Sequence, residues 1–105
     1  MINSLILQAL RPLRVPVSFQ KYRGKESTYI TFFSYLEQGE QYEDNEEKET
    51  GYYIQIDVWS KSDYTELVEN VINLMKAAGF RRTSAADLFE EDTKIYHKAL
   101  RFLYI

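Results

Sequence analysis

The strongest constraint on this fold is a change of hydrophobic period between two neighbouring segments, residues 52–60 and residues 63–79. The first segment has the two-residue period of a strand, with two alternating sets of side chains: Tyr52, Ile54, Ile56 and Val58, then Tyr53, Gln55, Asp57 and Trp59. The second has an apolar stripe at the helical period, with Asp63 and Glu66 spaced as a capping box and Gly79 placed as a left-handed C-cap. A strand followed closely by an amphipathic helix predicts a sheet with a helix packed against it.

Shorter signals fill the rest of the chain. We expect a short helix within residues 3–10 and further strands at 15–20, 28–36, 80–83 and 94–105. Residues 84–93 are predicted to form a loop or a single turn. Pro16 favours an edge position for its strand, because proline has no N–H for the ladder. Adjacent strands with short connections favour antiparallel pairing. The prediction is one α+β domain over residues 1–105, with a mainly antiparallel sheet flanked by helices.

Charge is strongly segregated along the chain, although the net charge at pH 7 is only -3. Residues 1–25 contain no acid and five bases, namely Arg11, Arg14, Lys21, Arg23 and Lys25. Residues 37–50, the acidic stretch, contain one base and seven of the sixteen acids: Glu37, Glu40, Glu43, Asp44, Glu46, Glu47 and Glu49. Such asymmetry indicates different surfaces for different partners.

The acidic stretch lies between two predicted strands, so we expect it to form the long loop of a hairpin. Three roles are open for this loop. It is a solvated surface with no partner, or it faces passing DNA, whose phosphates its carboxylates repel. The third role is docking onto a basic partner.

The basic segment and the strand aromatics are candidate contact surfaces. Arg11 and Arg14 suit a partner, a neighbouring subunit or nucleic acid. Tyr53 and Trp59 belong to a second aromatic strand face, which suits subunit contacts, helix packing or base stacking.

Residues that would carry chemistry are scarce. His97 is the only histidine and has no Ser or Asp pattern beside it, so we interpret it as structural. The chain has no Cys, and its four glycines are too scattered for a phosphate-binding loop. No run approaches the roughly 20 apolar residues of a membrane span. We therefore expect no catalytic residue, metal, cofactor or membrane partner.

Four segments in order carry a family resemblance. They are Gly51-Tyr-Tyr-Ile-Gln-Ile-Asp-Val-Trp-Ser-Lys-Ser-Asp-Tyr64, Leu74-Met-Lys-Ala-Ala-Gly-Phe80, the acidic Phe89-Glu-Glu-Asp92, and Tyr96-His-Lys-Ala-Leu-Arg-Phe102. This order resembles the tail-completion proteins of long-tailed bacteriophages and prophages, also called tail terminators or tail-to-head joining proteins. The resemblance covers nearly the whole chain, most clearly residues 28–105.

The resemblance implies a structural virion protein with an α+β fold and no enzymatic activity or cofactor. It implies a homo-oligomeric ring, usually of six subunits, between the tail tube protein and the head connector protein. In such a ring, an acidic hairpin tip that projects into the lumen would let DNA pass without being bound. Its location is then the tail-head junction of the virion, after assembly in the host cytoplasm. The alternatives are a head-completion or neck protein and a small nucleic-acid-binding module; a small enzyme is the least favoured.

Overall fold

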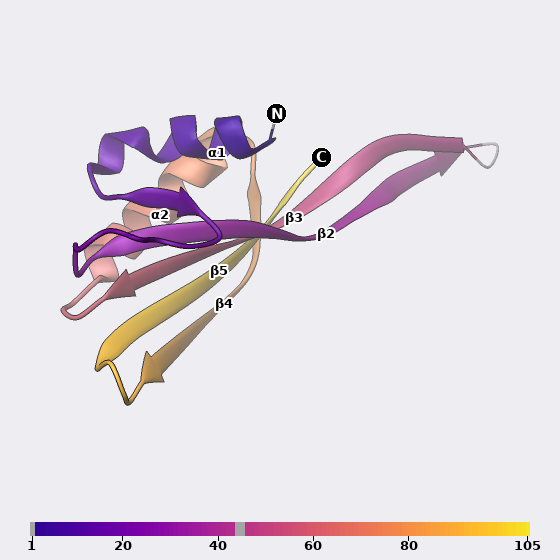
Figure 1. Cartoon of the computed structure of the whole chain (residues 1–105). Helices are drawn as coiled ribbons and strands as arrows, with labels where there is room; N and C mark the ends of the chain where they lie inside the picture. Colours follow the sequence, from indigo (N-terminus) through magenta and orange to yellow (C-terminus); the bar gives the residue numbers. More distant parts are fainter. Residues whose placement is uncertain (1, 44–45) are drawn as a thin grey trace.

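The computed structural model describes the backbone of residues 2–43 and 46–105, and the side chains of residues 2–36 and 51–105. Two α-helices, one 3₁₀ helix and five strands follow one another along these residues (Figure 1). Their order is α1 (Ile2–Leu10), η1 (Arg11–Leu13), β1 (Val17–Phe19), β2 (Tyr29–Glu43), β3 (Glu46–Ser60), α2 (Thr65–Ala77), β4 (Arg81–Glu90) and β5 (Ile95–Tyr104). Neither α-helix is long and apolar enough, within these residues, to cross a membrane.

The five strands form one sheet in the order β1-β2-β3-β5-β4. The pairs β2–β3, β3–β5 and β4–β5 are antiparallel, which confirms the predicted α+β class with a mainly antiparallel sheet. The first pair differs, because β1 and β2 are parallel, with Val17 opposite Ile30. Residues 20–28 carry the chain back past β1, so that β2 starts beside the first residue of β1 and runs in the same direction. The two strands therefore do not form a hairpin.

The edge position predicted from Pro16 is confirmed, because β1 is the outermost strand on its side of the sheet. The carbonyl of Pro16 accepts a hydrogen bond of 2.8 Å from the backbone N–H of Ile30. Proline keeps its acceptor although it lacks a donor, so it fits at the end of an edge strand.

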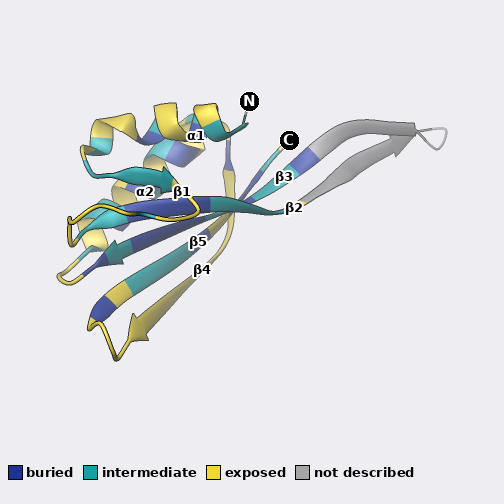
Figure 2. Ribbon diagram, in the orientation of Figure 1, coloured by how far each residue is buried: buried dark blue, intermediate teal, exposed yellow. Residues whose placement is uncertain are grey.

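The core lies between the sheet and the two α-helices, which cover the same side of it (Figure 1). The buried positions of β2 and β3 lie beneath these helices (Figure 2). The sheet and the helices contribute alternating or helically spaced side chains to one cluster: Ile6, Leu10, Ile30, Phe32, Ile54, Ile56, Val58, Val68, Val71, Met75, Phe80, Leu100 and Phe102. The strand period and the helix period seen in the sequence therefore meet in a single core.

Helix α2 begins later than the sequence predicts. Asp63 accepts hydrogen bonds from the backbone N–H of Thr65 at 2.9 Å and from its hydroxyl at 2.7 Å. The predicted capping box with Glu66 is wrong, because Asp63 satisfies a donor two residues ahead, as in an Asx turn. These hydrogen bonds lower the pKa of the Asp63 carboxyl.

The end of α2 confirms the predicted glycine cap. Gly79 has a φ of 101°, a conformation that side chains with a Cβ rarely adopt. Its N–H donates to the carbonyl of Lys76 at 3.0 Å, and the N–H of Phe80 donates to that of Met75 at 3.0 Å. This pair of bonds is a Schellman motif, which satisfies the last carbonyls of the helix and turns the chain into β4.

The start of α2 is fastened to the outer strands by side chains. The hydroxyl of Tyr64 donates to Asp87 at 2.8 Å, and the ammonium of Lys98 donates to the other carboxylate oxygen at 3.1 Å. Burial, followed by the hydrogen bond to Asp87, raises the pKa of Tyr64 to about 12. The hydrogen bonds from Tyr64 and then Lys98 lower the pKa of Asp87.

The predicted loop or single turn over residues 84–93 is wrong for residues 84–90, because β4 continues as a strand from Arg81 to Glu90. The turn itself follows at residues 91–94. All ten of its residues are exposed, so the segment has no buried face to impose an alternating pattern on its sequence. Pairing with β5 supplies its hydrogen bonds, with a register shift between Arg82 and Ser84. A strand with no buried face leaves no hydrophobic period to detect.

The predicted hairpin between residues 28–36 and 52–60 is confirmed, and its strands extend further than the sequence indicates. β2 reaches Glu43 and β3 starts at Glu46, so most of the acidic stretch is strand backbone and not loop. β5 pairs with β3 only from Tyr52 onwards, and β2 and β3 continue together beyond the other strands (Figure 1). The Cα radius of gyration is 14.8 Å, larger than the roughly 13 Å of a compact chain this long.

Candidate functional site

The side of the sheet opposite the helices carries a distinct set of residues, which we call the open face. Side chains alternate along a strand, so the neighbours of core residues point to this side. Its central members are Tyr29, Thr31 and Phe33 of β2, Gln55, Asp57 and Trp59 of β3, and His97, Ala99 and Arg101 of β5. No helix in the described part of the chain covers it (Figure 1).

A row of stacked rings crosses one end of the open face. The register places Tyr29 opposite Trp59, and Trp59 opposite His97. The ring centroids of Trp59 and His97 are 3.8 Å apart at 13°, and those of Tyr29 and Trp59 are 5.9 Å apart at 18°. Tyr22 extends the row from the loop before β2, at 4.4 Å from Tyr29. The rings of Tyr29 and Trp59 thus stack on each other and on their neighbours, which disfavours the base-stacking role considered for them.

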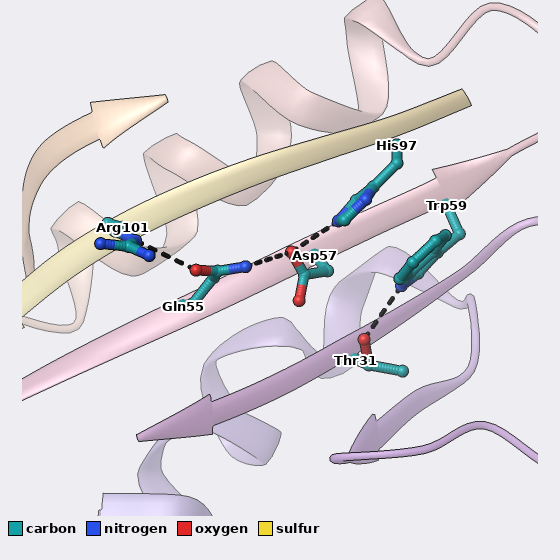
Figure 3. Close-up of polar contacts among 6 residues, drawn as sticks. All are labelled: Thr31, Gln55, Asp57, Trp59, His97 and Arg101. Atoms are coloured by element: carbon teal, nitrogen blue, oxygen red, sulfur yellow. Dashed lines mark hydrogen bonds and ion pairs between the residues drawn. The ribbon is translucent and has the colours of Figure 1, made fainter. Parts of the chain in front are cut away.

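A chain of polar contacts runs along the open face beside these rings (Figure 3). Arg101 Nε donates to Gln55 Oε1 at 3.0 Å, and Gln55 Nε2 donates to Asp57 Oδ1 at 2.8 Å. His97 Nε2 lies 2.6 Å from the same Asp57 oxygen. One carboxylate oxygen of Asp57 thus meets both Gln55 Nε2 and His97 Nε2. The chain links β3 to β5 with all four side chains hydrogen-bonded.

The Asp57–His97 pair is largely removed from solvent. Their side chains are 6% and 13% exposed, and Trp59 stacks on the imidazole. Asp57 lies opposite Ala99 and Trp59 opposite His97, so the two partners are diagonal neighbours on one face. The sequence interpretation of His97 as structural did not include Asp57, which lies 40 residues away. The contact could have been found from the sequence only by pairing the two strands so that Asp57 and His97 point to the same face of the sheet.

A second feature lies where the ring row meets the sheet edge. A hollow of about 350 Å³, which we call the basic hollow, is lined by Gln20, Lys21, Tyr22, Arg23, Tyr29, Thr31 and Trp59. Trp59 Nε1 donates to Thr31 Oγ1 at 2.9 Å, which fixes the indole on the hollow's wall (Figure 3). Lys21 and Arg23 are exposed. The hollow therefore combines two cations with aromatic walls.

The loop that carries these cations is shaped by Tyr22. The Tyr22 hydroxyl oxygen accepts the backbone N–H of Glu26 at 2.9 Å, so the chain turns around the ring. A Cβ on Gly24 would collide with the Tyr22 ring, so any larger residue there would displace this ring. No pattern in the sequence predicts the contact between Tyr22 and Tyr29, because it depends on how this loop folds back onto the start of β2.

The residues predicted as contact surfaces are separated in the structure. Arg11 and Arg14 are exposed, in η1 and at its left-handed C-cap. Trp59 lines the basic hollow, whereas Tyr53 lies further along the open face, with its ring 6.0 Å from that of Tyr35. The open face brings Trp59 together with His97 and not with Tyr53.

The predicted acidic site falls on residues whose side chains the structure does not describe. Asp44 lies wholly outside the described residues. The other members have a strand backbone, but their side chains lie outside the described residues: Glu37, Glu40, Glu43, Glu46, Glu47 and Glu49. Within the part of the chain that is described, no group of three or more His, Cys, Asp or Glu could hold a metal ion.

Comparisons with known proteins place the fold. No protein-family model and no curated protein matches this sequence. A chain from the solved structure of the "Virion of native gene transfer agent (GTA) particle" has a similar fold, with a TM-score of 0.63. The match covers 97% of this chain and 91% of that one, at 13% sequence identity. The whole α+β arrangement is therefore shared with a chain of that virion.

Proposed function

We propose that this chain is a structural protein of a phage-like particle, and that it ends the tail tube and joins the tail to the head as one subunit of a ring. The observation that carries the proposal is the likeness to a gene transfer agent virion chain over nearly the full length of both chains. The resemblance of residues 28–105 to tail-completion proteins supports the tail-terminating position.

The distribution of surfaces also supports a ring. Subunits of a ring meet head to tail, so each subunit needs two different contact surfaces. This chain has an open sheet face and a basic hollow near the start of β2, and a hairpin at the far end of the same strand. A protein with unlike surfaces at its two ends suits closed head-to-tail assembly.

The remaining parts of the proposal concern partners and chemistry. The ring would meet the tail tube protein on one side and the head connector protein on the other. The net charge of -3 and the seven acids of the acidic stretch suit a channel through which DNA passes without being held. The role is non-catalytic, and the Asp57–His97 pair acts within it as a hydrogen-bonded tie between β3 and β5.

Deleting the gene in the host that makes the particle tests this function. We expect electron microscopy to show heads and tails that do not join, with tails of irregular length because nothing ends the tube. Restoring the gene with an affinity tag should place gold label at the head-tail junction. Tails of normal length beside leaking heads would favour a head-completion protein, and unchanged particles would overturn the proposal.

A further inference from the structure

The basic hollow presents two cations that have no acidic partner among the described residues. Within the described part of the chain, the bases that form ion pairs are Lys94, His97 and Lys98, and neither Lys21 nor Arg23 is among them. Lys21 and Arg23 are exposed and, together with Tyr29 and Trp59, line this open hollow of about 350 Å³. A concave site with aromatic walls and unpaired cations suits an acidic segment that also carries an aromatic residue.

The chain itself contains a segment of this chemistry. The acidic stretch, residues 37–50, holds seven acids, the single base Lys48 and the aromatic Tyr42. The negative charge of this segment is complementary to the positive charge of the basic hollow, and complementary potentials fix both partner choice and register.

The acidic stretch of the same chain is too far away along β2 to fill the hollow. Tyr29, which lines the hollow, is the first residue of β2, and Glu43 is the last. At about 3.3 Å per residue, Glu43 lies about 46 Å along the strand from Tyr29, and Glu37 lies about 26 Å along it. The basic hollow and the acidic stretch thus belong to opposite ends of β2.

We infer that the basic hollow binds the acidic stretch of a second copy of this chain. The inference rests on the proposed function, which brings copies together in a ring, and it names the contact between neighbours. Acid at one end and base at the other make a heterologous contact, which closes into a ring when the rotation per subunit allows it. DNA is the less favoured occupant, because the rings of Tyr29 and Trp59 already stack on each other and on Tyr22 and His97, which leaves little ring face for bases.

A peptide of residues 37–50, added to the full-length protein, tests the inference. Trp59 is the only Trp of the chain and lines the hollow, so its fluorescence reports occupancy, and the peptide has no Trp. At low salt we expect saturable binding that weakens as salt rises. The double variant Lys21→Glu/Arg23→Glu should weaken it by about tenfold or more, from two exposed charge contacts.

Two controls separate this site from general charge attraction. The double variant Arg81→Glu/Arg82→Glu makes the same change of charge on exposed residues of β4, and it should bind the peptide as the wild type does. A peptide with each acid replaced by its amide should not bind. Circular dichroism should show that all variants are folded, because the four substituted residues are exposed.

The outcomes also separate this inference from the proposed function. Equal binding by the wild type and Lys21→Glu/Arg23→Glu, or binding of the amide peptide, would overturn the inference. Tighter capture of a DNA oligonucleotide than of the peptide would assign the hollow to nucleic acid. If Lys21→Glu/Arg23→Glu still forms rings in electron microscopy, the inferred contact between the hollow and the acidic stretch is overturned, while the proposed ring is supported. If the protein binds the peptide but is absent from purified particles, the contact between copies is supported and the proposed virion role is refuted.

Discussion

The two faces of the sheet are built from the same strands but are stabilised in different ways. The covered face is apolar, and Phe32, Ile56 and Phe102 on it have no exposed area. The open face relies on ring stacking and a chain of hydrogen bonds that reaches Asp57. Burial of apolar surface is non-directional, whereas stacking and hydrogen bonds require register. The covered face thus provides most of the stability, and the open face fixes how β3 and β5 are aligned.

The largest effect should come from the covered face. Replacing Phe102 with Ala should destabilise the fold by about 3–5 kcal/mol, because it removes apolar contacts and leaves a cavity. Urea denaturation followed by circular dichroism measures the change. The exposed Phe89 on β4 is the matched control, and Phe89→Ala should cost much less. Equal losses at the two positions would break the distinction between the faces.

Removing Asp57 should produce the largest effect on the open face. Asp57→Ala leaves Gln55 and His97 without their shared acceptor, so we expect a loss of about 1–3 kcal/mol in the free energy of unfolding. A double-mutant cycle with His97→Ala isolates their interaction. A coupling energy near zero would show that the pair contributes no more than its separate parts.

Trp59→Phe tests the orientation of the indole. Phenylalanine retains a ring for stacking but loses the Nε1–H that donates to Thr31, so the cost should be about 1 kcal/mol. Far-UV circular dichroism during urea unfolding measures it without the tryptophan signal. A loss as large as that of Phe102→Ala would mean that the open face contributes to the core.

The smallest effect concerns Tyr64, at the rim of the covered face. Its pKa is raised to about 12 in the folded protein, so it stabilises the fold below its ordinary pKa of about 10. That contribution is lost as the pH rises through about 12. Tyr64→Phe should cost about 0.5–1 kcal/mol at neutral pH, and its difference from the wild type should shrink between pH 10 and 12. Urea midpoints across this range provide the check, and a constant difference would contradict it.

Local signals in the sequence predicted the elements that depend on local chemistry. The alternation in residues 52–60 and the cap at Gly79 were correct, because burial of one face and a left-handed backbone limit the allowed residues directly. The strand at residues 80–83 was predicted, but its continuation to Glu90 was missed because neither face of β4 is buried. The Asp57–His97 contact and the basic hollow depend on the β3–β5 and β2–β3 registers, which no local pattern specifies.

The exposure of β4 has a consequence for concentrated protein. As the last strand of the sheet, it offers free backbone donors and acceptors to any other extended chain. Its exposed charges Arg81, Arg82 and Glu90 and its register shift oppose such edge-to-edge growth. The sheet thus carries its own protection against aggregation into cross-β fibres along this edge.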